Sequence, residues 1–200
     1  MDNDDARIQP WGLLLSLLLL AGLVLVMAFA IVFPVQVTVD EASLHHFALA
    51  APGNGTPAFT LAYNVSLVVA VHNKNWAMRV RRTAPLDAEL RFAGRPFVRV
   101  RLAGVADSDR IRPLKTAVYR VATADGNTPP VALGRHAAAE LARERAAGAF
   151  VLELVVTGEL KYQAHPHARS LKVSCPLKLL LSTAPAPAAF AGVQCTPTQA

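Results

Sequence analysis

The longest apolar stretch of the 200-residue chain lies near its N-terminus and runs from Leu13 to Phe33. Ser16 is the only ordinary polar side chain within it. As an α-helix rising about 1.5 Å per residue, the stretch would be about 31 Å long, which matches the hydrocarbon core of a bilayer at about 30 Å. Trp11 precedes it, where an indole suits the headgroup region, and Pro34 follows it. The sequence therefore predicts a transmembrane helix over residues 13–33.

The alternative for this stretch is a cleaved signal peptide, for which Ala28-Phe29-Ala30 would be an acceptable cleavage site. However, the preceding residues carry Asp2, Asp4 and Asp5 with only Arg7, which is not the positively charged leader of a signal peptide. The apolar stretch also exceeds the usual length of about 7–15 residues. We favour an uncleaved anchor.

The orientation of the anchor follows from the few charges near its ends. Arg7 lies on the N-terminal side, whereas the first basic residue on the other side is the distant Lys74. Because Lys and Arg are enriched in cytoplasmic flanks, residues 1–12 are predicted to be a short cytoplasmic tail. Two glycosylation sequons, at Asn54 and Asn64, follow the anchor, so we expect the C-terminal domain outside the cytosol.

The rest of the chain has the alternation of an antiparallel β-sandwich. Apolar and polar side chains alternate with a period of two, leaving each strand one apolar and one polar face. The predicted strands cover residues 59–72, 79–81, 86–92, 97–102, 152–162 and 171–179. The alternation places Asn64 on an outer face, and Phe97 on the polar face with Arg99 and Arg101.

One segment departs from this alternation. Residues 135–147 are rich in Ala, Leu, Glu and Arg and end at Gly148, which predicts one short helix. The predicted class is all-β, with one short helix and a single N-terminal transmembrane helix. Residues 34–58 form a juxtamembrane segment and first strand, residues 59–183 the sandwich, and residues 184–200 a C-terminal tail.

Positive charge is concentrated in the first part of the sandwich. Residues 74–120 hold 12 Lys and Arg against 4 Asp and Glu, in a chain of net charge +6. The outward-facing candidates are Arg79, Arg81, Arg91, Arg99 and Arg101. Such a surface attracts an anionic partner, for which acidic polysaccharide and lipid headgroups are the candidates outside the cytosol. Nucleic acid is not expected as a partner of a membrane-tethered ectodomain.

No catalytic motif or metal-binding pattern stands out. The aspartates at positions 107 and 109 lie among basic residues and are expected to form a solvated, charge-balanced loop. His45-His46 and His165-Pro166-His167 would bind a metal only if their loops met, and no carboxylate accompanies them at ligand spacing. We expect no enzymatic activity, no metal and no cofactor.

The two cysteines, Cys175 and Cys195, are 20 residues apart. Cys175 lies on the inward face of a predicted strand and would pack as a small apolar side chain if it were a free thiol. Outside the cytosol we favour a disulfide that holds the C-terminal tail to the sandwich, because oxidising compartments allow pairing. A loop of this size would be stabilised by about 3 kcal/mol in the chain-entropy model.

Several short motifs occur in a characteristic order after the anchor. They are Tyr63-Asn64-Val65-Ser66-Leu67, Val71-His72-Asn73-Lys74-Asn75, Phe92-Ala93-Gly94-Arg95-Pro96-Phe97, Gly158 with Lys161, and Lys172-Val173-Ser174-Cys175-Pro176. Over roughly residues 10–195 the chain resembles the plant late-embryogenesis-abundant type 2 proteins. More narrowly, it resembles their membrane-anchored branch, the non-race-specific-disease-resistance and harpin-induced-like proteins.

The resemblance implies an immunoglobulin-like or fibronectin-like sandwich, a single anchor, no catalytic residues, and a role in plant defence or stress at the plasma membrane. The chain departs from the family at two places. Lys74 stands where members often have proline, and residues 106–116 replace their Tyr-Gln-Gly element.

The predicted function is that of a membrane-anchored, non-enzymatic interaction module. Its expected partners are the lipid bilayer, an anionic cell-wall polysaccharide or other membrane proteins. The alternative is a stress-protective domain that stabilises membrane or protein surfaces during dehydration without a defined ligand.

Overall fold

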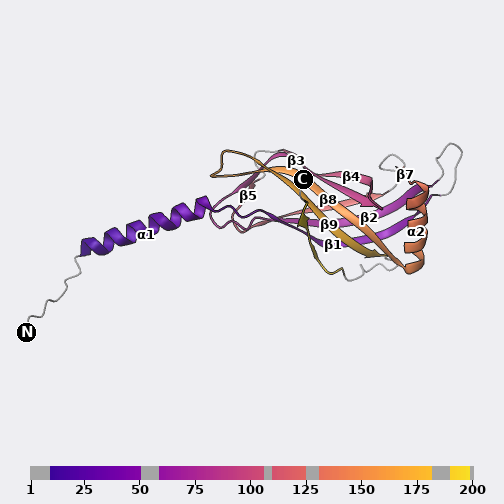
Figure 1. Cartoon of the computed structure of the whole chain (residues 1–200), viewed down its shortest axis with the longest axis horizontal. Helices are drawn as coiled ribbons and strands as arrows, with labels where there is room; N and C mark the ends of the chain where they lie inside the picture. Colours follow the sequence, from indigo (N-terminus) through magenta and orange to yellow (C-terminus); the bar gives the residue numbers. More distant parts are fainter. Residues whose placement is uncertain (1–9, 51–58, 106–109, 125–130, 182–189, 199–200) are drawn as a thin grey trace, which may run out of the picture.

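The computed structural model describes residues 10–50, 59–105, 110–124, 131–181 and 190–198. Helix α1 (Pro10–Ala30) projects from one end of an elongated β-sandwich (Figure 1). Within α1, the segment Trp11–Ala30 is long and apolar enough to cross a membrane. The helix ends three residues before the predicted limit at Phe33. Pro34 contributes to this difference, because its ring disfavours helical geometry at Phe33, the residue before it.

The sandwich consists of two antiparallel sheets, which confirms the predicted all-β class. The first sheet has the order β10-β1-β2-β6, with β7 beside β2, and the second has the order β11-β9-β8-β3-β4, with β5 beside β3. The strands of the first sheet are β1 (Gln36–Leu49), β2 (Thr60–His72), β6 (Thr116–Ala124), β7 (Val131–Ala132) and β10 (Val193–Gln194). Those of the second are β3 (Val80–Phe92), β4 (Arg95–Ala103), β5 (Arg110–Ile111), β8 (Ala149–Tyr162), β9 (Arg169–Leu180) and β11 (Thr196–Pro197).

The predicted inward faces form the core. The inward side chains of β2 and β9 are all buried, namely Leu61, Tyr63, Val65, Leu67, Val69 and Val71 on β2, and Leu171, Val173, Cys175, Leu177 and Leu179 on β9. Asn64 is exposed on β2, as the alternation predicts. Phe59 differs: it lies just before β2 with a positive φ of 67° and is exposed.

The prediction for Phe97 is wrong. The pairing of β3 with β4 passes from Leu90 opposite Val98 to Arg91 opposite Pro96, so Phe97 occupies a bulge in the ladder. A bulge places two residues of one strand opposite one of its partner and shifts the alternation by one. Phe97 is therefore buried beside Val98, rather than lying on the polar face.

The end of the sandwich far from α1 is packed with aromatic rings and covered by the second helix. The ring of Phe47 lies 5.2 Å from Phe92, 5.7 Å from Phe97 and 5.2 Å from Phe150, in edge-on contacts. Helix α2 (Arg135–Ala147) has the predicted limits and lies at this far end (Figure 1). It buries three small or apolar residues, Ala137, Ala138 and Leu141. It ends at Gly148, whose φ of 74° suits glycine because a Cβ is disfavoured there.

Strand β6 and the strands of the C-terminal segment were not among the predicted strands. Thr and Ala occupy much of β6, so its alternation is weak in the sequence. Residues 193–197 are part of both sheets rather than a tail outside the fold: β10 pairs with β1, and β11 pairs with β9. Cys195 lies between them and forms a disulfide with Cys175, the predicted pair. The bond therefore fastens the edges of the two sheets together.

Candidate functional site

The residues that join α1 to the sandwich lie in the loop between β2 and β3. Asn75 is 1% exposed, and its side chain clamps the main chain of Phe33, which follows α1. The Phe33 amide donates to Asn75 Oδ1 at 2.9 Å, and Asn75 Nδ2 donates to the Phe33 carbonyl at 2.8 Å. A buried side-chain amide here satisfies two backbone groups that would otherwise be without partners.

Asn73 fixes the position of Asn75 and of a second loop. It is fully buried, and its Oδ1 accepts hydrogen bonds from the backbone N–H and from Nδ2 of Asn75. Its Nδ2 donates to the Met78 carbonyl at 2.8 Å and lies within 3.3 Å of the carbonyl oxygens of Ile111 and Arg112. We define Asn73 and Asn75 as the asparagine clamp. Only the family resemblance marks these residues in the sequence, because nothing in the alternation predicts buried amides.

Two further contacts hold α1 and the chain that follows it against the sandwich. The Val35 amide donates to the Tyr162 hydroxyl at 3.2 Å, and burial raises the pKa of that phenol above its ordinary value. Phe29 and Val32 pack against the hydrophobic core, and Ala28 is only 4% exposed. The end of the sandwich thus contacts the last turn of α1 itself and lies next to the point where the apolar helix ends.

A basic cleft opens beside this junction. It has a volume of about 220 Å³ and is lined by Arg79, Arg81, Arg110 and Lys161, together with Tyr162 and Gln163. The backbone N–H of Gln163 donates to the Arg79 carbonyl at 3.0 Å, which joins the turn after β8 to the start of β3. Two of the five predicted surface arginines, Arg79 and Arg81, belong to this cleft.

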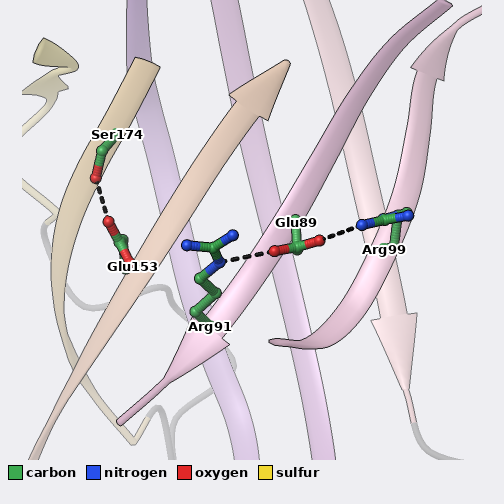
Figure 2. A network of polar contacts seen from close by, with 5 residues as sticks. All are labelled: Glu89, Arg91, Arg99, Glu153 and Ser174. Carbon is green, nitrogen blue, oxygen red and sulfur yellow. Dashed lines mark hydrogen bonds and ion pairs between the residues drawn. The ribbon is translucent and has the colours of Figure 1, made fainter. Parts of the chain in front are cut away.

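The other three predicted arginines are engaged in ion pairs on the outer face of the second sheet. Glu89 lies between Arg91 and Arg99 and contacts both, as Figure 2 shows. Hydrogen bonding from Arg99 is the main cause that holds the pKa of Glu89 below its ordinary value. Arg101 pairs with Asp87 at 3.4 Å. Arg91 and Arg99 therefore share one carboxylate, and Arg101 pairs with another.

The loops around the asparagine clamp also expose two large apolar side chains. Trp76 is 55% exposed and Leu114 is 58% exposed. The Leu114 amide donates to the Asn75 carbonyl at 3.1 Å, so the two loops lie side by side next to the exit of α1. Neither residue was singled out by the sequence, because each is an isolated apolar residue among polar and basic neighbours.

Charge is strongly asymmetric at this end. The segments 73–81, 110–115 and 161–169 contain no Asp or Glu and carry Lys74, Arg79, Arg81, Arg110, Arg112, Lys115, Lys161 and Arg169, a formal charge of +8. Adding the two aspartates of residues 106–109 leaves +6, as much as the whole chain carries. We call these three segments the helix-proximal end. Within the described part of the chain, none of its eight cations forms an ion pair with a carboxylate.

The two histidine pairs do not converge. His45 and His46 lie in the second half of β1, whereas His165 and His167 lie in the turn after β8, next to the start of β1. No group of three metal-ligating side chains occurs among residues that the structure describes. Asn54 and the aspartates at 107 and 109 lie outside the described residues.

Comparison with known proteins adds no functional information. No protein-family model matches the chain, and no curated protein matches it. Among solved structures, the Northeast Structural Genomics Consortium target SoR45 is similar at a TM-score of 0.41 and 12% identity, covering 79% of this chain and 92% of that one. A protein from Archaeoglobus fulgidus is similar at a TM-score of 0.32 and 7% identity, covering 72% of this chain and 99% of that one.

Proposed function

We propose that the protein is a membrane-anchored, non-enzymatic interaction module that uses the helix-proximal end to bind an anionic partner. The observation that carries the proposal is the junction. An exposed apolar helix of membrane-spanning length is clamped by Asn75 to a folded sandwich, and the basic residues surround that clamp. An anchor held in this way keeps the cations at the membrane surface, where attraction to anionic groups is strongest.

The biological setting of the proposal comes from the resemblance to the membrane-anchored late-embryogenesis-abundant type 2 proteins. We propose a role in plant defence or stress at the plasma membrane, with the N-terminus cytoplasmic and the sandwich outside. The exposed position of Asn64 and the disulfide between Cys175 and Cys195 support this orientation, because glycans and disulfides form outside the cytosol.

The experiment that tests the anchor is carbonate extraction of membranes from cells that express the full chain, with sequencing of the mature N-terminus. The expected result is an intact chain that stays in the pellet. A mature N-terminus near Ile31, with release by carbonate, would mean that α1 is a signal peptide.

Orientation is tested by a glycosidase-dependent mobility shift. Asn64→Gln should remove the part of the mobility shift that is due to a glycan at Asn64. Asn54→Gln is the matched variant for the other sequon. Absence of any shift in the wild-type chain would oppose the proposed orientation.

Saturable, salt-sensitive binding of an anionic partner supports an interaction module, whereas the stress-protective alternative predicts no saturation.

A further inference from the structure

The structure assigns a partner to the helix-proximal end: we propose that it binds the headgroup layer of the bilayer that α1 crosses. In this arrangement Trp76 and Leu114 enter the interface and the surrounding cations contact lipid phosphates. The inference rests on the proposed function, because it requires α1 to span a membrane. It adds a second membrane contact, made by the sandwich itself.

Trp76 and Leu114 lie next to the exit of α1. Phe33 follows α1 by three residues and is hydrogen-bonded to Asn75, the residue directly before Trp76. The Leu114 amide is bonded to the Asn75 carbonyl. When the apolar helix fills the hydrocarbon core, Trp76 and Leu114 are therefore carried to the boundary where the helix leaves it. Trp11, at the other end of α1, lies at the opposite boundary, since 20 residues span about 30 Å.

The exposed side chains at this exit have the chemistry of a membrane interface. An indole has an apolar ring and a polar N–H, and it prefers the boundary between hydrocarbon and headgroups. Ile31 and Phe33 are also exposed, at 44% and 46%, so four apolar side chains gather around the exit of α1. Exposed apolar side chains gathered at one site mark an interaction surface.

The backbone at Leu114 has an unusual conformation. Leu114 has a positive φ of 54°, a left-handed backbone conformation that residues other than glycine rarely adopt. Hydrogen bonds on either side hold it there, from the Leu114 amide to the Asn75 carbonyl and from the Lys115 amide to the Arg112 carbonyl. A leucine held in this conformation and still 58% exposed is consistent with a side chain displayed for contact.

Positive charge surrounds Trp76 and Leu114. Lys74, Arg112 and Lys115 are exposed and flank Trp76 and Leu114, and the basic cleft of Arg79, Arg81, Arg110 and Lys161 lies beside them. Guanidinium and ammonium groups bind phosphate oxygens through charge-assisted hydrogen bonds. Basic residues around apolar insertions are the pattern of a surface that rests on phospholipid.

The test uses the full chain reconstituted in nanodiscs of phosphatidylcholine, with and without phosphatidylglycerol. The chain has two tryptophans, so Trp11→Phe leaves Trp76 as the sole indole. Acyl chains brominated near the headgroup should quench Trp76 emission strongly. The matched control is Trp11→Phe/Trp76→Phe/Val151→Trp, which places the sole indole on the exposed face of β8 near α2, where no quenching is expected.

The role of charge is tested by Lys74→Gln/Arg112→Gln/Lys115→Gln in the Trp11→Phe background. In discs that contain phosphatidylglycerol, the equilibrium should shift toward unquenched Trp76 by about fivefold per neutralised cation. This is the attraction expected for each basic residue at an anionic surface. The control Arg135→Gln/Arg145→Gln/Lys178→Gln removes the same charge near α2 and should leave quenching unchanged. Equal unfolding temperatures of the two triple variants verify that both are folded.

The outcomes separate this inference from the proposed function. A chain that does not stay with the discs contradicts the anchor, whereas a chain that stays with the discs but shows Trp76 no more quenched than the control indole overturns the lipid contact. Loss of quenching on addition of polygalacturonate, or of excess inorganic phosphate, would also overturn it, because the site would then prefer a polysaccharide or a free anion. Unchanged quenching with both additions supports the lipid headgroup layer as the partner.

Discussion

Different interactions stabilise the two ends of the sandwich. The end near α2 is packed with the rings of Phe47, Phe92, Phe97 and Phe150, and α2 carries both acidic and basic residues. The helix-proximal end is organised by the amides of Asn73 and Asn75 and exposes cations with Trp76 and Leu114.

The apolar packing that stabilises the fold and the exposed residues of the candidate site therefore lie at opposite ends of the strands. Aromatic packing needs only apolar volume and excludes water, so it suits an end that has no anchor to position. A loop that must hold the chain leaving α1 in one position needs directional contacts, which hydrogen bonds supply. The buried amides therefore determine where the exposed residues stand relative to α1.

The largest effect is expected from Phe47→Ala at the aromatic end. Removing a ring with three edge-on neighbours should lower the free energy of unfolding by about 3–5 kcal/mol. Denaturant unfolding in detergent measures it. Leu180→Ala, at a side chain 56% exposed, is the control and should change stability much less. A similar loss in both variants would show that the aromatic end is not the main source of stability.

Breaking the disulfide should have the next largest effect. Cys175→Ala/Cys195→Ala removes a bond across a separation of 20 residues, for which the chain-entropy model gives about 3 kcal/mol. Hydrogen exchange should show loss of protection at Val193 and Gln194, whose strand is fastened by this bond. Protection that persists in the variant would mean that strand pairing with β1 and β9 is enough to hold the segment.

Asn73→Ala should destabilise the helix-proximal end. The variant leaves buried backbone groups without partners, at about 1–3 kcal/mol for each buried group that stays unsatisfied. We expect faster amide exchange in residues 73–79 and 110–115, with exchange near Phe47 unchanged. The exposed Asn64→Ala is the matched control. Uniform loss of protection over the whole sandwich would contradict a separate role for the clamp.

The smallest effect is expected from acid titration of the ion pairs on the outer face. The folded-state pKa of Glu89 is lowered, so its stabilising contribution is complete above the ordinary value of 4.5 and is lost as pH falls through the folded-state pKa. Glu89→Gln should therefore flatten the decline of the unfolding temperature below about pH 4.5. Arg135→Gln, on α2, should leave the decline as steep as in the wild type. An equal decline in the wild type and Glu89→Gln would show that the pair contributes nothing measurable.

The sequence by itself determined the features that depend on local pattern. Alternation identified the inward faces of β2, β8 and β9, and composition with a glycine stop identified α2, because both are set by side chains close together in the chain. The length of the apolar stretch likewise identified a helix able to cross a membrane. The bulge at Phe97 escaped this reasoning, because one extra residue in a ladder is decided by the partner strand.

Only the tertiary structure decided which residues make the candidate site. The helix-proximal end draws on three segments, 73–81, 110–115 and 161–169, which adjoin only after the strands between them have paired. Strand pairing also places two of the five predicted arginines in the basic cleft and the other three beside carboxylates. A sequence pattern reports the face of a strand on which a residue lies, whereas the neighbours on that face come from other strands far away along the chain.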